Sequence, residues 1–404
     1  MIPDLITTLH ARAIEHLDLR NTGNIDGDAG RWREIAVRFL DREMEEMGIP
    51  ESDQFLVRTV IIDEMFSYGP ITPLLRDPDV SEVMVVGKDL VYFEKNGIIQ
   101  QSTVKFSSDN SLRAAIDRII TSVNRRLDES NPFADARLPD GSRVNAIIPP
   151  VSLSGPCLTI RKFRPTPYSM PELVSIGALS HEAAVFLESA VTGRMNIIIS
   201  GGTGSGKTTM LNALSQFIPD SERVITIEDA AEIRLVKPHV VRLESRPPNV
   251  EGKGEVTIRD LVRNSLRMRP DRIIVGECRG AEALDMLQAM NTGHDGSITT
   301  GHANTPRDML RRLETMVLVG GIDIPIRAIR EQIASAIELI VHVSRLGNGK
   351  RAITSITEIA GIGDNQILLQ DIFQRDAKGK RDEDPPLLRT GIRSKIESGD
   401  DGGW

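Results

Sequence analysis

The chain has 404 residues, which at roughly 100–200 residues per domain predicts two or three domains. Its net charge of −8 argues against a surface built for general nucleic-acid binding. Cys157 and Cys278 lie too far apart for a C-x-x-C zinc site, and no apolar run approaches the roughly 20 residues that span a bilayer. We therefore expect a soluble, cytoplasmic protein without zinc, whose membrane association comes through partners.

The N-terminal region, residues 1–55, is rich in helix formers. Helices are expected over 31–47 and 52–67, and the Gly/Asp-rich stretch 21–30 is expected to be a loop. Residues 56–163 then predict a small α+β domain. Its expected elements are strands at 81–87, 90–96, 98–106 and 158–163, a helix at 109–126 and a hairpin at 136–148.

Three prolines in RPTPYSMPELVSIG (164–177) predict an interdomain linker, because proline restricts both itself and its predecessor. From 178 to 375 strands and helices alternate, which predicts an α/β domain with a parallel-rich sheet covered by helices. The charged, Gly/Pro-rich segment 376–404 is expected to be a flexible tail.

The sequence GGTGSGKT (201–208) fits the phosphate-binding pattern G-x-x-x-x-G-K-[ST] between an apolar strand and a helix. Glycines let backbone N–H groups turn onto phosphate oxygens, and the helix N-terminus adds a favourable dipole. The lysine supplies a point charge, and the threonine hydroxyl can ligate Mg²⁺. ATP and Mg²⁺ are thus the expected cofactors. The residues expected to bind the nucleotide are Gly201, Gly202, Thr203, Gly204, Ser205, Gly206, Lys207, Thr208 and Thr209.

Hydrolysis also requires acidic residues that orient the attacking water and hold the metal shell. Glu228 and Asp229 end the predicted strand RVITIE, and Glu277 ends DRIIVGE. Both sites lie at carboxyl ends of strands, the edge at which open α/β sheets bind ligands. We expect Glu228 to act as general base and Glu277 as a catalytic residue, with Thr208, Asp229 and Glu277 around Mg²⁺. Which of Glu228 and Glu277 activates water stays open.

Four motifs in this order resemble the secretion ATPase superfamily that powers type II secretion, type IV pili and type IV secretion. They are the Walker A box at 201–208, the Asp box ITIEDAAE (225–232), the Walker B box MRPDRIIVGECR (268–279) and the His box TGHDGSITTGH (292–302). The stretches 69–87, 138–163 and 292–317 are similar to the CpaF-like branch, the Tad/Flp pilus assembly ATPases. The chain lacks the cysteines of the zinc insert found in the type II secretion branch.

This resemblance implies a RecA-like ATPase domain in a homohexameric ring that drives pilus assembly or secretion through an inner-membrane platform. It also implies that Arg143 and Arg161 of the N-terminal domain reach the nucleotide phosphates. His294 and His302 flank a Gly/Ser/Thr-rich strand expected beside the Walker B strand. We expect them to sense the phosphates or Glu277 by hydrogen bonding.

Three alternatives are weighed against a Tad/Flp motor. A conjugative type IV secretion ATPase shares the Walker and His boxes. A RecA-like nucleic-acid motor is disfavoured by the acidic balance and by an aromatic content of 4%, which leaves little for base stacking. A scaffold without turnover conflicts with the intact Lys207, Glu228 and Glu277.

Overall fold

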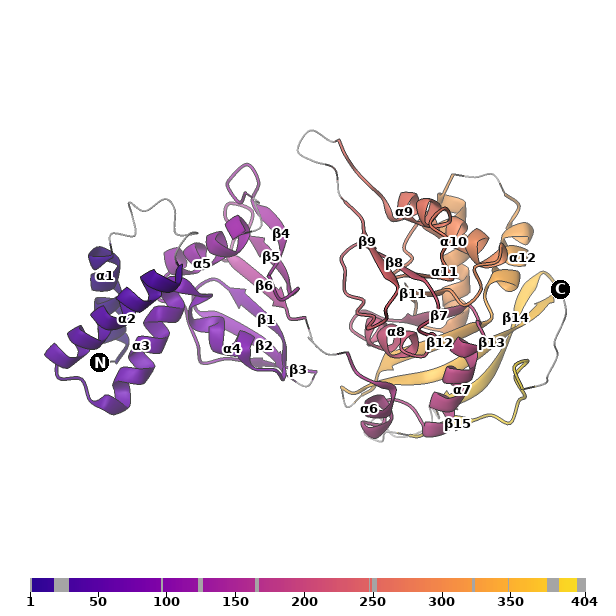
Figure 1. Ribbon diagram of the computed structural model, residues 1–404, viewed down its shortest axis with the longest axis horizontal. Helices are drawn as coiled ribbons and strands as arrows, with labels where there is room; N and C mark the ends of the chain where they lie inside the picture. The colour runs from indigo at the N-terminus through magenta and orange to yellow at the C-terminus, as the bar shows by residue number, and fades with distance from the viewer. Residues whose placement is uncertain are drawn as a thin grey trace. The chain divides into compact units, whose positions relative to one another are not determined.

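The computed structural model describes residues 2–17, 29–95, 97–122, 126–163, 167–246, 248, 253–321, 324–347, 349–375 and 385–397. The chain divides into two compact units, Met1–Pro165 and Thr166–Trp404 (Figure 1). Their boundary falls inside the segment 164–177 that was predicted to be a linker. None of the helices in the described ranges combines the length and apolar composition needed to cross a membrane.

Three helices begin the first unit: α1 (Ile2–His16), α2 (Ala29–Glu46) and α3 (Glu51–Phe66). They pack around a core of their own that includes Leu9, Leu40 and Ile61. Helix α3 crosses position 55, where the sequence placed the end of the helical region, so the helices and the α+β part share this element. Most of the loop predicted at 21–30 lies outside the described residues.

A six-stranded antiparallel sheet completes the first unit, in the order β3-β2-β1-β6-β5-β4. Its strands are β1 (Val80–Val86), β2 (Leu90–Lys95), β3 (Ile98–Gln101), β4 (Phe133–Arg137), β5 (Arg143–Ile147) and β6 (Cys157–Arg161). Helix α5 (Asp109–Ser122) packs on it through Ile116 and Ile119, and the short helices η2 (Gly69–Ile71) and α4 (Thr72–Arg76) precede β1. Strand β3 is shorter than the predicted 98–106, because the Ser102 hydroxyl accepts the Val104 N–H and turns the chain.

The second half of the proline-rich segment is helical: α6 spans Met170–Ser175. Ser169 and Glu172 form a reciprocal capping box, and Pro171 occupies the first turn, where proline is tolerated. This part of the predicted linker is therefore a capped helix. Residues 164–166 lie outside the described ranges.

The second unit is built on a nine-stranded sheet in the order β15-β14-β13-β12-β7-β11-β10-β8-β9. The strands from β9 to β12 in this order pair in parallel, and β13, β14 and β15 extend the sheet antiparallel beyond β12. The strands are β7 (Ile197–Gly201), β8 (Val224–Glu228), β9 (Val240–Glu244), β10 (Arg272–Val275), β11 (Ile298–His302), β12 (Leu339–Arg345), β13 (Arg351–Gly363), β14 (Gln366–Arg375) and β15 (Leu387–Arg389). The predicted α/β class with a parallel-rich sheet is confirmed.

Helices cover both faces of this sheet. Side chains alternate along a strand, so Ile197 and Ile199 join one core with α7 (His181–Thr192) and α8 (Lys207–Ser215). Ile198 points into the opposite core. That core contains α9 (Ile258–Ser265), α10 (Glu282–Asn291), α11 (Pro306–Val319) and α12 (Ile326–Ala336). Burial on both faces explains the continuous apolar run of β7.

The described part of the predicted flexible tail, residues 385–397, is ordered against the second unit. Strand β15 pairs with β14, and the buried Ser394 donates its hydroxyl to the fully buried Glu358 at 2.8 Å. The Lys395 N–H also donates to Glu358, at 3.1 Å. A buried carboxylate on β13 therefore holds this segment, which its charged composition did not predict.

Candidate nucleotide-binding site

The P-loop follows β7 and wraps closely because its glycines permit it. A Cβ built on Gly201 would lie 2.2 Å from the carbonyl oxygen of Val343, so a side chain cannot be accommodated there. Gly204 (φ 67°) and Gly206 (φ 102°) adopt left-handed conformations, and Gly206 caps α8. This conformation leads the backbone directly into the helix N-terminus, where N–H groups without intrahelical partners favour an anion.

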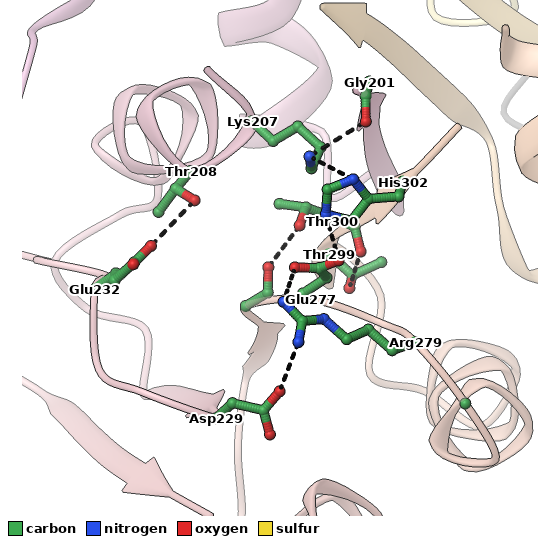
Figure 2. Close-up of polar contacts among 12 residues, drawn as sticks. Gly201, Lys207, Thr208, Asp229, Glu232, Glu277, Arg279, Thr299, Thr300 and His302 are labelled. Atoms are coloured by element: carbon green, nitrogen blue, oxygen red, sulfur yellow. Dashed lines mark hydrogen bonds and ion pairs between the residues drawn. The ribbon is translucent and has the colours of Figure 1, made fainter. Parts of the chain in front are cut away.

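Lys207 begins α8 and is almost fully buried in the loop. Its ammonium group donates to the carbonyl oxygens of Gly201 (3.2 Å) and Gly202 (2.9 Å), and it lies 3.4 Å from His302 Nδ1 (Figure 2). The hydroxyl of Ser205 is buried and has no hydrogen-bond partner among the described residues. An orphaned donor, a centred lysine and a helix N-terminus together fit a group rich in phosphate oxygens. Thr203, Thr208 and Thr209 lie on the same loop and first helical turn.

The strand order brings the His box and the Walker B box beside the P-loop. Strand β11 lies between β7 and β10, and its last residue, His302, is opposite Gly201 in the register. His302 Nε2 lies 2.9 Å from Glu277 Oε1, at ion-pair distance, although Glu277 Oε1 makes no aligned hydrogen bond. Both residues therefore stand at the carboxyl edge of the sheet, as the sequence predicted.

His302 joins two charged residues in one chain of contacts. Burial lowers the pKa of His302, and the positive charge of Lys207 lowers it further, so the imidazole is neutral at pH 7. Because an ammonium group can only donate, the Nδ1 atom facing Lys207 must be the acceptor. The ring proton then lies on Nε2 and faces the Glu277 carboxylate.

Glu277 is held between two partners. Its Oε2 atom accepts a hydrogen bond of 2.8 Å from Arg279, opposite the side that faces His302. Burial alone would raise the pKa of Glu277, but the Arg279 hydrogen bond and the positive charges of Arg279 and Lys207 outweigh it and lower the pKa. Glu277 is therefore a carboxylate at neutral pH, in the form that a base or a metal-shell ligand requires.

The Asp box contributes a residue that sequence reasoning missed. Glu232, the last residue of ITIEDAAE, lies 3.5 Å from the Thr208 hydroxyl. Glu228 is buried, and its Oε2 atom accepts the N–H groups of Glu232 (2.6 Å) and Ile233 (2.8 Å), while its Oε1 atom has no hydrogen-bond partner among the described residues. Burial raises the pKa of Glu228. The geometry makes Glu228 the clamp of the loop that presents Glu232, and its predicted role as general base stays a prediction.

The structure separates the two histidines of the His box. His294 precedes β11 and contacts the carbonyl of Ala289 at the end of α10, whereas His302 ends β11. Five strand residues span about 15 Å, so only His302 lies at the P-loop edge. The expected sensor role therefore fits His302 and not His294 within one chain.

Arg143 and Arg161 lie in the first unit, directly opposite each other on β5 and β6. Arg137 on β4 is in turn opposite Arg143. Directly paired residues of antiparallel strands share a face, so three guanidinium groups form a row. Arg161 is in turn opposite Glu82 on β1, so an acidic residue stands at the end of this row of basic ones.

The residues expected around Mg²⁺ do not gather into one cluster of ligands. No group of three or more His, Cys, Asp and Glu within the described ranges could hold a metal ion. Thr208 and Glu232 offer hard oxygen atoms at the start of α8, while Arg279 stands between Glu277 and Asp229, 3.7 Å from the Asp229 carboxylate. This donor set fits a Mg²⁺ ion that is bound mainly through phosphate and water oxygens.

Comparison with known proteins identifies a family and several relatives that this chain resembles. The family described as "Type II/IV secretion system protein" matches residues 64–367. A Mycobacterium tuberculosis protein named for conjugal transfer is 39% identical over 345 residues, which cover 84% of this chain and 97% of that protein. The conjugal transfer protein TrbB of Rhizobium radiobacter is 33% identical, over 74% of this chain and 90% of TrbB. The type IV secretion system protein VirB11 of Bartonella henselae is 32% identical, over 71% and 90%.

Solved structures support the fold. The ATPase DotB of Legionella pneumophila aligns with a TM-score of 0.52 and 23% identity, over 70% of this chain and 78% of DotB. The pilus retraction motor PilT, solved with bound ADP, aligns with a TM-score of 0.51 and 21% identity, over 71% and 80%. The family match covers most of the chain and includes every motif of the site, and the chain belongs to the type II/IV secretion system protein family.

Proposed function

We propose that this chain is an ATP hydrolase that works as a motor of its secretion family. The observation that supports this most is the continuous set of contacts from Lys207 through His302 to Glu277. It joins the phosphate-binding lysine to a carboxylate that is ionised at neutral pH. The names of the relatives VirB11 and DotB, a secretion protein and an ATPase, agree with this reading.

In this mechanism the residues of the loop exchange partners when ATP binds. Lys207 leaves the carbonyl oxygens of Gly201 and Gly202 for β- and γ-phosphate oxygens. Thr208 would hold Mg²⁺, which would neutralise charge on the phosphate oxygens. Glu277 orients the attacking water and accepts its proton, and His302 keeps the carboxylate aimed at the γ-phosphate.

Coupling to movement uses the first unit. We propose that the arginine row, with Arg143 and Arg161 as predicted, stabilises γ-phosphate charge, since guanidinium groups match phosphate geometry. The contact selects one arrangement of the two units, and hydrolysis releases it. A homohexamer of such subunits at the cytoplasmic face of the inner membrane would push on platform proteins.

Two branches of the family remain candidates for the assembly that is driven. The stretches 69–87, 138–163 and 292–317 favour Tad/Flp pilus assembly. The relatives named for conjugal transfer favour a role in conjugative type IV secretion, and one of them covers 84% of this chain. Deletion of the gene followed by assays of surface pilin and of plasmid transfer would separate them.

The biochemical test is ATP turnover by the purified chain, with its oligomeric state measured by light scattering. We expect Mg²⁺-dependent ATP hydrolysis by hexamers and its loss in Lys207→Ala. Absence of hydrolysis by the folded wild-type hexamer would refute the proposed function. Stimulation by single-stranded DNA, rather than by membrane partners, would favour the nucleic-acid motor.

A further inference from the structure

Arg279 lies in the loop between β10 and α10, and its backbone is anchored on both sides. Glu282 accepts the N–H groups of Arg279 (2.6 Å) and Gly280 (2.8 Å). The preceding residue, Cys278, donates its N–H to the Thr300 carbonyl on β11 at 2.9 Å. The start of the Arg279 side chain is therefore fixed relative to β11 and α10, although its end is exposed.

The guanidinium group of Arg279 joins two motifs that are separate in the sequence (Figure 2). One nitrogen donates to Glu277 Oε2 at 2.8 Å, and another lies 3.7 Å from Asp229 Oδ2. Asp229 follows β8, and its second oxygen accepts the hydroxyl of Ser245, which follows β9, at 3.1 Å. Arg279 thus connects Glu277 of the Walker B box to Asp229, which is itself hydrogen-bonded to a residue directly after the edge strand β9.

Glu277 consequently has a partner on each oxygen. His302 faces Oε1 and Arg279 faces Oε2, and they come from different elements. Because Oε1 has no aligned hydrogen bond among the described residues, the Arg279 hydrogen bond to Oε2 is the contact that restrains the carboxylate, and its rotation would misdirect an attacking water. An ion pair at an exposed site contributes little to stability, so stability alone does not account for this arrangement.

We infer that Arg279 is a positioning residue, which holds Glu277 in its working orientation and couples that orientation to Asp229 in the Asp box. The inference rests on the proposed ATP hydrolysis and adds a residue to it. When the loop after β8 shifts, Asp229 moves with it. The guanidinium group of Arg279 follows Asp229, and the Glu277 carboxylate rotates as a result. The position of Asp229 then affects the orientation of the water-activating carboxylate without a contact between Asp229 and the nucleotide.

The test compares Arg279→Gln, Arg279→Lys, Asp229→Asn and the double variant Arg279→Gln/Asp229→Asn with the wild type. Arg327→Gln is the matched control, because Arg327 forms an exposed ion pair of 3.0 Å with Glu331 on α12 of the same unit. For each we would measure kcat and KM for ATP, the affinity for a fluorescent ADP analogue, and Tm.

We expect kcat to fall about 10–100-fold in Arg279→Gln, with KM and ADP-analogue affinity within about threefold of the wild type. Arg279→Lys should recover part of kcat, because lysine keeps the charge but reaches one carboxylate at a time. The double variant should lose less than the product of the single losses, because both changes break the same link. Arg327→Gln should match the wild type.

Wild-type kcat in Arg279→Gln would overturn the inference, and independent losses in the double variant would overturn the coupling to Asp229. A raised KM together with a weakened affinity for the ADP analogue would show that Arg279 binds nucleotide instead of positioning Glu277. That result would also overturn the inference. If Arg279→Gln has a lowered Tm, Arg279→Lys and Asp229→Asn carry the test with the same split between kcat and KM. Failure of the proposed function is distinct, because the wild type itself would then lack turnover.

Discussion

Glu228 is either the general base or the residue that holds the loop carrying Glu232, and a pair of substitutions can decide between these two roles. The structure gives its Oε2 atom two backbone donors, the N–H groups of Glu232 and Ile233, in a position where Glu228 is 3% exposed. Hydrogen bonds to charged groups contribute about 1.5–3 kcal/mol each. Glu228→Ala should therefore lower the free energy of unfolding by roughly 3–6 kcal/mol and release the loop that carries Glu232.

Glu228→Gln is the informative partner of that change. The glutamine carbonyl can accept both N–H groups, while the substitution removes a buried negative charge and any ability to take a proton. We expect stability within about 1 kcal/mol of the wild type and turnover within a fewfold. Urea denaturation and steady-state ATP hydrolysis measure the two quantities. A folded Glu228→Gln without turnover would restore Glu228 as general base, and an unchanged stability of Glu228→Ala would refute the clamp.

Four further outcomes are expected. Lys207→Ala should fold normally but lose about 100-fold or more in turnover, measured by phosphate release, because the charge on the phosphates is gone. Glu277→Gln should bind ATP in a filter assay yet hydrolyse it about 100-fold or more slowly; normal turnover would make Glu277 a structural carboxylate. Arg143→Ala and Arg161→Ala should each reduce turnover more than ATP affinity, because their contact strengthens in the transition state; wild-type turnover in both would exclude them from the mechanism. Burial raises the pKa of Glu338, so its contribution to stability is present at low pH and is lost as pH rises through the folded-state pKa. The Tm of Glu338→Gln relative to the wild type should therefore rise as the pH is raised above the ordinary range of a carboxyl group, and a constant difference would contradict this.

The phosphate loop and the sheet around it could be predicted because their requirements are local. The glycine spacing, the apolar run before Gly201 and the helix after it are readable from a dozen residues. The carboxyl ends of parallel strands share one edge, so Glu277 and His302 could be placed near the loop without coordinates. The same reasoning, applied to strand direction, would have placed His294 at the opposite edge.

The direction of side chains and the contacts between segments far apart in the sequence could not be predicted in this way. Glu228 lies at the correct strand end, but the chain after it folds back and offers two N–H groups, which turns the carboxylate inward. Glu232 and Arg279 stood in the recognised motifs with only their residue type as a signal. The ordering of 385–397 depends on Glu358, a carboxylate on another strand that its own segment cannot reveal.

The charges at the sheet edge alternate from one element to the next. A lysine on α8, a neutral histidine on β11, a carboxylate after β10, an arginine in the same loop and an aspartate after β8 follow in order through Lys207, His302, Glu277, Arg279 and Asp229. Removing one member leaves its neighbours with uncompensated charge, so the loss propagates along the row. A phosphate that draws Lys207 away acts on the same row from its other end. We therefore propose that occupancy of the P-loop changes the surroundings of Asp229 through these contacts, which measure 2.8 to 3.7 Å.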